Sequence, residues 1–265
     1  MKNREIIKNS ILFPIRNYKE FIIITLLFLL TELIQEHFPH EINDAFTTIP
    51  AFFVFIILPL LVLGINLQII FHLIGENSGL PKLSFKKSLK EAFHDVLLES
   101  YYYILTILIT VILAIPTGIF THFVEISGQL NNISIEIEEM NVIQVIGSIP
   151  DLILYDSQTL LLCLLIFIIT LTIMFSMCTL GKIDIEKNHN FKQALNIRYI
   201  FSLIKKIGIL KYLEFILLII IICVMVANIV FILNFSEMIG SIISSFLESL
   251  SLFFFLSSFA QLYPN

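Results

Sequence analysis

LPKLSFKKSLKEAFHDVLLESYYYILTILITVILAIP (residues 80–116) contains, in one stretch, the two kinds of helix from which the chain is built. In residues 84–100 the apolar side chains recur at helical spacing and the charged side chains fall on the opposite face, which is typical of a helix lying on a membrane surface. Residues 101–115 carry no charge and predict a membrane span. The unit that we expect is therefore an interfacial helix leading directly into a spanning helix.

The composition of the whole chain excludes a soluble domain. Of its 265 residues 57% are hydrophobic and only 14% are charged, whereas soluble proteins have roughly 25% charged residues. Cys163, Cys178 and Cys223 all lie in apolar runs, without a spacing that suits a zinc site or a disulfide framework. We interpret them as buried free thiols.

Charge-poor runs of about 20 residues recur along the chain and predict an all-α fold, a polytopic membrane helical bundle in a single domain of residues 1–265. We place six transmembrane helices at residues 21–38, 49–74, 101–124, 158–180, 212–233 and 239–262. Two or three interfacial amphipathic helices are expected, at residues 2–16, 84–100 and 191–206. The connection 125–151 is predicted to be an acidic loop, and kinks are expected at Pro59 and Pro116.

The basic residues predict the orientation in the membrane. All 16 Lys and Arg lie in residues 2–19, 82–90 and 182–211, and the alternate connections have none. This alternation satisfies the positive-inside rule over six spans. We therefore expect a multi-pass protein of the cell membrane with both termini in the cytoplasm. Its predicted partners are the lipid bilayer and a homo-oligomer or another membrane protein, and no nucleic acid.

The interfacial helices suggest an internal repeat. Residues 7–11, 85–89 and 191–195 share the order apolar, Lys, polar, small, aliphatic. Each precedes a pair of predicted spans, so three parallel hairpins would cover residues 1–75, 82–180 and 191–265. The alternative is that any basic amphipathic helix resembles the others.

Glu248 is the ionisable residue deepest in a predicted span. An ionisable group at mid-bilayer costs at least ~2.5–3.5 kcal/mol on insertion scales, so it must face protein or a water-filled cavity. One interpretation is a proton or cation site, and the other is a protonated Glu that is hydrogen-bonded to a neighbouring helix. A stripe of small residues with a spacing of four accompanies it and suits close helix packing: Ser241, Ser245 and Ser249.

Other polar residues occur in spans one and two. Gln68 and His72 are four residues apart on one helical face, with Asn66 nearby, and they either line a polar path or bond between helices. Glu32 and Glu36 are also four apart, near the outer end of span one, and we interpret them as a solvent-facing pair.

Basic residues of the interfacial helices are candidates for contacts with lipid head groups, each contributing ~1 kcal/mol near an anionic surface. They are Lys86, Lys87, Lys90, Lys205 and Lys206. The signatures of zinc proteases, dinucleotide-binding folds and P-loops are absent from the sequence, so we predict no catalytic, cofactor-binding or metal-binding residue.

Several short motifs resemble one known family. They are Gly64 in the second span, Gly79-Leu80-Pro81, the span ending in Ala114-Ile115-Pro116, and residues 191–196 continuing through Lys206-Ile207-Gly208. On these residues the chain resembles the domain-of-unknown-function 4013 family, integral membrane proteins of archaea and bacteria. The resemblance implies a six-span bundle and no established activity.

Two functions from different classes fit these observations. The first is a non-enzymatic scaffold or accessory component of the membrane. The alternative is a small proton- or cation-linked transporter that uses Glu248. Scarcity of charge within the predicted spans favours the first, because coupled transporters need more polar groups in the membrane.

Overall fold

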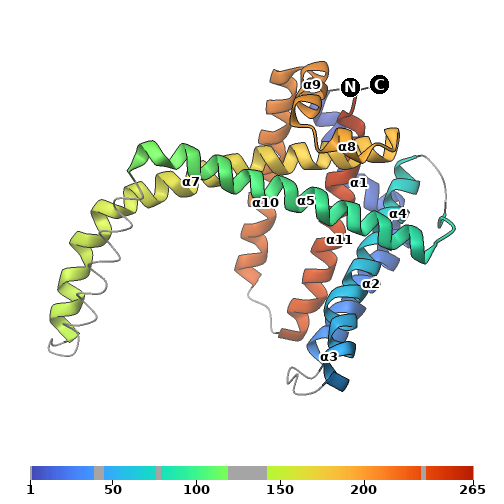
Figure 1. Cartoon of the computed structure of the whole chain (residues 1–265), viewed down its shortest axis with the longest axis horizontal. Helices are drawn as coiled ribbons and strands as arrows, with labels where there is room; N and C mark the ends of the chain where they lie inside the picture. The colour runs from blue at the N-terminus through green and yellow to red at the C-terminus, as the bar shows by residue number, and fades with distance from the viewer. Residues whose placement is uncertain (1, 39–44, 76–78, 119–141, 234–236, 265) are drawn as a thin grey trace. The chain divides into compact units, whose positions relative to one another are not determined.

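The computed structural model describes residues 2–38, 45–75, 79–118, 142–233 and 237–264, and every regular element in them is helical (Figure 1). Two compact units are formed, one by Met1–Leu98 with Met177–Asn265 and the other by Glu99–Ser176. In chain order the helices are α1 (Asn3–Arg16), α2 (Tyr18–Glu36), α3 (Ala45–Phe52), η1 (Phe53–Ile57), α4 (Leu58–Ile74), α5 (Phe85–Ala114), η2 (Ile115–Thr117), α7 (Val142–Asn188), α8 (Phe191–Ala194), α9 (Ile197–Ile207), α10 (Ile209–Leu233) and α11 (Glu237–Leu262).

The prediction of an all-α polytopic membrane bundle is confirmed. Among the described residues, five helices are long and apolar enough to cross a membrane: Ile49–Ile74, Phe85–Thr117, Leu161–Asn188, Ile209–Val226 and Gly240–Leu262. The first predicted span, residues 21–38, is helical as α2. It is not among the five because its 19 residues include Lys19, Glu20, Glu32 and Glu36. The count of six spans therefore stays a prediction, as does the three-hairpin repeat.

The boundaries predicted for the two longest helices, α5 and α7, differ from those in the structure. Helix α5 runs without a break from its amphipathic start into its apolar part, because no Pro or Gly separates them. Helix α7 begins at Val142 and ends at Asn188, so residues 142–151 are helix rather than loop, and residues 181–188 are helix rather than connection. The rest of the predicted acidic loop, and the end of the third predicted span, lie outside the described residues.

The expected interruptions at Pro59 and Pro116 are confirmed. Proline cannot donate to the carbonyl four residues earlier, and its ring crowds that carbonyl. Before Pro59 the chain widens into the π-helical turn η1, where the amide of Leu58 donates to Phe53 O. Pro116 lies in the 3₁₀ turn η2, which ends at Gly118 in the left-handed region at φ 73°.

The predicted interfacial helix at residues 191–206 is two helices. Helix α8 stops at Ala194, and the side chain of Asn196 then caps α9 by accepting from the amides of Arg198 and Tyr199 at 3.1 and 3.3 Å. Helix α9 ends at Gly208, whose φ of 99° suits a residue without a side chain. This break turns a single predicted helix into two short ones.

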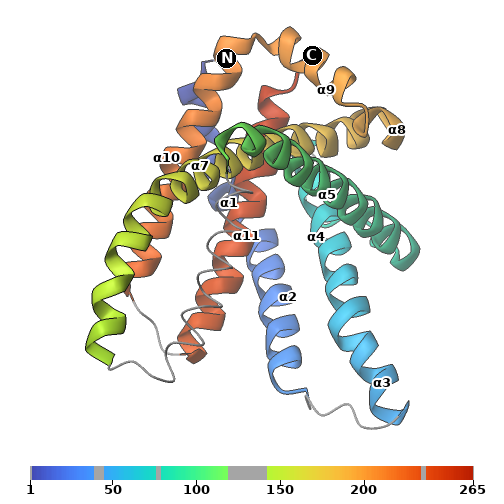
Figure 2. The same ribbon diagram turned by 60° about the vertical axis from the view of Figure 1, so that its left-hand side comes forward.

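Helices α1 and α2 pack along α11, with aromatic rings in contact across both interfaces. The ring of Phe253 lies 5.7 Å from that of Phe13 and 5.5 Å from that of Phe21, centroid to centroid. Phe21 also meets Phe246 edge-on at 5.4 Å. Phe21 near the start of α2 meets Phe253, whereas Glu32 near its end meets Ser245, so the two helices run antiparallel (Figure 2).

Helices α4 and α5 approach each other closely at Gly64. A Cβ atom on this glycine would overlap the carbonyl oxygen of Ser88 on α5. Because backbone atoms cannot give way as a flexible side chain can, glycine is required here for packing rather than for its backbone freedom.

We predict that Gly64→Ala destabilises the protein by about 1–3 kcal/mol, since overpacking a close contact costs that much and outweighs the gain in helix propensity. Gly240→Ala is the matched control, because a Cβ there meets nothing within 4 Å and alanine favours a helix. Thermal unfolding in detergent, followed by circular dichroism, measures both. A Tm of Gly64→Ala equal to that of Gly240→Ala would contradict the close contact.

Candidate functional site

The end of α4, the start of α5 and the end of α7 meet in a layer of polar side chains. On α5 the inward-facing residues include Ser88, which is 1% exposed, and Asp95, which is 6% exposed. The apolar face points outward instead, with Phe85 and Phe93 more than half exposed. Helix α5 therefore buries Ser88 and Asp95 while it exposes two phenylalanines, as a helix at a membrane surface can.

A buried ion pair joins α5 to α7. The ammonium of Lys182 lies 2.8 Å from the Asp95 carboxylate, and the two side chains are 10% and 6% exposed. Removing two charges from water is costly, and close contact between them offsets that cost. The pair is therefore a strict constraint on how these two helices meet.

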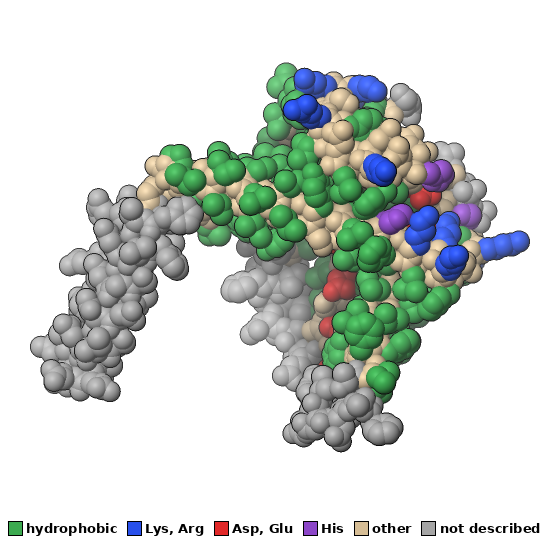
Figure 3. Space-filling view, viewed as in Figure 1, with side chains coloured by type: hydrophobic (Ala, Val, Ile, Leu, Met, Phe, Trp, Pro, Cys, Tyr) green, Lys and Arg blue, Asp and Glu red, His purple; other side chains and the backbone are tan. Residues whose placement is uncertain are grey.

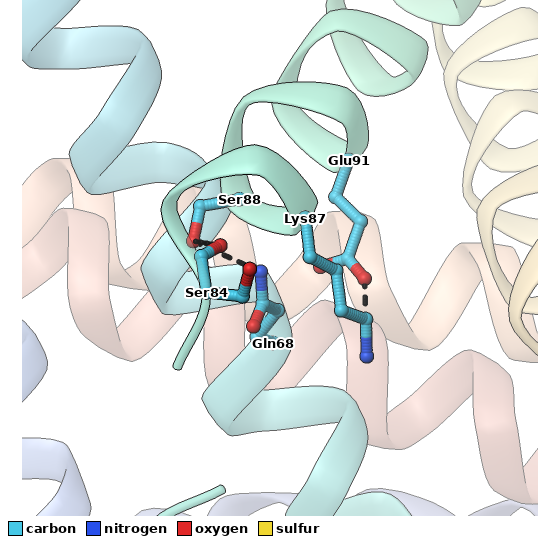
Figure 4. Close-up of polar contacts among 5 residues, drawn as sticks. All are labelled: Gln68, Ser84, Lys87, Ser88 and Glu91. Atoms are coloured by element: carbon cyan, nitrogen blue, oxygen red, sulfur yellow. Dashed lines mark hydrogen bonds and ion pairs between the residues drawn. The ribbon is translucent and has the colours of Figure 1, made fainter. Parts of the chain in front are cut away.

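One chain of hydrogen bonds joins α4 to α5 (Figure 4). The amide nitrogen of Gln68 donates to Ser88 Oγ at 2.9 Å, and Ser88 Oγ donates to the carbonyl of Ser84 at 3.1 Å. The carbonyl of Ser84 also accepts from the backbone amide of Ser88 at 2.8 Å, so Ser88 links Gln68 to the first turn of α5. The oxygen Oε1 of Gln68 is left buried without a partner among the described residues.

A cavity of about 330 Å³ lies beside this chain, between α4, α5 and α7. Its polar lining comes from three separate parts of the sequence: Gln68, His72, Lys87, Glu91, Glu186 and Lys187. Lys87 Nζ is 3.4 Å from Glu91 Oε1, whereas the other oxygen of Glu91, Oε2, is buried with no partner in the described part of the chain. The carboxylate of Glu91 therefore lies between Lys87 and the amide of Gln68 at the wall of the cavity.

Asp184 on α7 holds the C-terminal part of the chain in place. Its side chain is fully buried, and its oxygen Oδ1 accepts from the hydroxyl of Tyr199 at 3.0 Å, from that of Tyr263, and from the Asn188 amide at 2.7 Å. Burial, followed by these bonds to the Asp184 carboxylate, raises the pKa of Tyr199 and of Tyr263. Helix α9 and the end of α11 are thereby fastened to one residue of α7.

The structure brings together some of the predicted polar residues and separates others. Gln68 and His72 line the cavity, as their shared helical face suggests. Asn66 does not line it: the residue is fully buried, and neither polar atom of its side chain has a hydrogen-bond partner among the described residues. Glu248 lies apart from all three, on α11.

Close to Glu248 in sequence, Ser245 of α11 is hydrogen-bonded to Glu32 of α2. Ser245 is 1% exposed and donates to Glu32 Oε2 at 2.8 Å, and Ser249 donates to Ser245 O at 2.8 Å. Of the predicted solvent-facing pair, Glu36 is exposed, whereas Glu32 is half-buried and bonded to α11. Glu248 is exposed and lies within electrostatic range of Glu32.

The predicted lipid-facing lysines are exposed at one end of the first unit. Lys86, Lys90, Lys205 and Lys206 are all exposed, and Lys87 is exposed along most of its side chain while lining the cavity. Figure 3 shows basic side chains over α9 and over the start of α5, with His nearby. Their contact with lipid stays a prediction.

Sequence reasoning missed Asp95, Asp184, Lys182, Glu91 and Glu186 as parts of this layer. All five lie in or beside segments interpreted as interfacial, where charged residues are expected to face water. Two spacings of four residues on one helical face signal local polar contacts, that of Asp184 with Asn188 and that of Lys87 with Glu91. The partners on other helices leave no mark in the sequence.

We predict that Lys182→Met destabilises the protein by about 3–5 kcal/mol, because it removes the ammonium that compensates the buried Asp95 carboxylate. Lys87→Met is the control: its pair with Glu91 is largely exposed, so the change should cost about 1 kcal/mol or less. Denaturation midpoints in detergent compare the two variants. Equal losses would show that burial of the Lys182 pair does not matter.

Comparison with known proteins points to one family. Neither the curated proteins nor the solved structures contain a match to this chain. A family model described as "Protein of unknown function (DUF4013)" matches residues 48–235, well over half of the chain. The matched residues include Gly64, Asp184 and the helices α4, α5, α7, α8 and α9. The chain therefore belongs to the DUF4013 family.

Proposed function

We propose that this multi-pass membrane protein is a non-enzymatic scaffold or accessory component of the cell membrane, with both termini in the cytoplasm. Its docking element is the pair of short helices α8 and α9. The observation that carries the proposal is the Asp184 cluster, which holds a basic surface helix in one position. A preorganised surface loses less entropy on binding than a mobile one.

The outward face of α8 and α9 is basic. Its exposed cations are Lys192, Arg198, Lys205 and Lys206, and residues 191–211 contain no Asp or Glu. Among these cations lies Phe201, which is 45% exposed, with the ammonium of Lys205 at 5.1 Å from its ring centroid. An aromatic side chain surrounded by fixed positive charge suits an acidic segment of another membrane protein.

The opposite face of α9 supports the same proposal. Ile200, Leu203 and Ile204 are buried, and Tyr199 reaches Asp184. Since the apolar side of α9 is already covered by protein, the helix is not free to insert into lipid. The basic side is therefore the face that a partner meets.

We predict that a photo-crosslinking amino acid in place of Phe201, in native membranes, forms an adduct with one protein through an acidic segment identified by peptide mapping. Lys205→Glu with Lys206→Glu should weaken the adduct roughly thirtyfold, as the loss of two charges of ~1 kcal/mol each would. Leu217 on α10, which is 60% exposed, is the control position and should yield lipid adducts. Lipid adducts alone at position 201 would contradict docking of a protein.

A second function, a small proton- or cation-linked transporter, is favoured by the placement of Glu32 opposite Glu248. Glu32 lies 14 residues after Tyr18, where α2 begins, and Glu248 lies 14 residues before Leu262, where α11 ends. At ~1.5 Å per residue both are about 21 Å from those ends, hence at the same depth in antiparallel helices. Two carboxylates at one depth suit a shared proton or cation.

For the transporter we predict carbodiimide labelling of Glu248 that depends on pH and is blocked by a transported cation. Glu32→Gln should abolish the protection by the cation, because one of its two carboxylates is gone. Glu36→Gln, an exposed residue one helical turn away, should leave it intact. Labelling that no cation affects, or none at all while Glu248→Gln folds normally, would leave Glu248 a packing residue.

A further inference from the structure

We propose that a second cavity, between the starts of α1 and α10, binds an anionic phosphate ester, supplied by the head group of an anionic phospholipid. The cavity has a volume of about 600 Å³ and is lined by Lys2, Asn3, Arg4, Lys211 and Glu214. Cavities of about 300–1,000 Å³ are usual for small-molecule sites. None of these residues belongs to the basic face of α8 and α9 or to the pair of Glu32 and Glu248, so the proposal does not depend on either function proposed above.

The charge of the lining indicates an anion. Three of the five lining residues are cations and one is a carboxylate, so two positive charges are in excess. In the part of the chain that the structure describes, Lys2, Arg4 and Lys211 form no ion pair with a carboxylate. A phosphate group carries negative charge and accepts hydrogen bonds from ammonium and guanidinium groups. It would therefore offset the excess, whereas a cationic ligand would increase it.

The side chain of Asn3 holds the cations of the two helices at one cavity. Asn3 is 4% exposed, and its amide nitrogen donates to the carbonyl of Lys211 and to Glu214 Oε2, both at 2.9 Å (Figure 2). A backbone carbonyl can only accept, so the nitrogen must face Lys211 and the amide cannot be turned over. The start of α1 is thereby fixed against α10. Glu214, the one carboxylate of the lining, is bonded to Asn3 rather than to a cation.

The exposed face of α10 indicates a lipid as the source of the phosphate. Leu210 is 83% exposed, and Leu217 and Ile221 are exposed as well. Together with Glu214 they follow one another at spacings of four, three and four residues, which places all four on one face of the helix. An apolar strip therefore passes the cavity and continues along a helix long and apolar enough to cross a membrane. An acyl chain can lie along this strip while its phosphate stays among the cations.

The alternative is a diffuse attraction of any basic residue to an anionic membrane. Each cation near such a surface contributes ~1 kcal/mol wherever it lies, so a diffuse attraction depends on the number of cations and not on their positions. A site depends on the particular cations that line it and on the Asn3 bonds that hold them. Variants of equal charge at different positions therefore distinguish the two.

The test uses the purified full-length protein in nanodiscs made of equal parts of phosphatidylglycerol and phosphatidylcholine. The first lipid is anionic and the second has no net charge. Native mass spectrometry measures how much of each lipid stays on the protein after release from the disc. We expect phosphatidylglycerol to be retained roughly tenfold more than phosphatidylcholine, since the lining has two positive charges in excess.

Paired variants locate the binding. Arg4→Gln with Lys211→Gln should abolish the preference for phosphatidylglycerol, because each lost cation weakens binding to an anionic phosphate about fivefold. Lys86→Gln with Lys90→Gln is the matched control, since it removes the same charge from exposed residues of α5 and should leave the preference nearly unchanged. An equal loss in the two double variants would mean diffuse attraction and would overturn the site.

Asn3→Ala separates position from charge. The variant keeps all three cations and Glu214 but releases the start of α1 from α10, so the preference should fall although the net charge is the same. Thermal unfolding followed by circular dichroism shows whether the variant is folded. A folded Asn3→Ala protein with an undiminished preference would contradict a site that Asn3 holds together.

Glycerol 3-phosphate distinguishes a lipid from a free ester of the same chemistry. Titrated into the unmodified protein in detergent, with a thermal-shift readout, it should bind far more weakly than the lipid, because it has no acyl chain for the apolar strip of α10. Tight binding of the free ester, with equal retention of the two lipids, would overturn the lipid as the ligand and assign the site to a soluble ester. Equal retention of the two lipids, with no binding of the free ester, would overturn the site.

Discussion

The ion pair between Lys182 and Asp95 is the constraint on which the polar layer depends. The two charges are almost fully buried, and their close contact offsets the cost of taking them from water. Because Asp95 lies on α5 and Lys182 on α7, the pair determines which faces of two long helices meet. That choice of face also decides where Gln68, Ser88 and the residues of the cavity lie relative to one another.

This arrangement explains why α5 buries two polar side chains and exposes two phenylalanines. A soluble helix would bury Phe85 and Phe93, but here they are exposed and Ser88 and Asp95 are buried. At a membrane surface the outer medium is partly apolar, so apolar side chains lose little by facing it. Gly64 permits the same contact from the side of α4, by letting the backbone of α5 come close.

The layer has two further consequences, and the docking proposal rests on the first. Asp184 extends it to α9 and to Tyr263, and so gives the basic helix a fixed position. The cavity is the place where the layer opens outward, between Gln68, Lys87 and Glu91 on one side and Glu186 and Lys187 on the other.

The sequence by itself determined the class of protein, the helices and most of their ends, because charge-poor runs, Pro59, Pro116 and Gly208 act locally. The sequence also placed Gln68 and His72 on one face, because helical periodicity is a local property. Only the tertiary structure decided that Asp95 meets Lys182, that Glu32 meets Ser245, and that Asn66 stays apart from the cavity. Those contacts join residues far apart in the chain, and helical periodicity specifies a face but not which helix it meets.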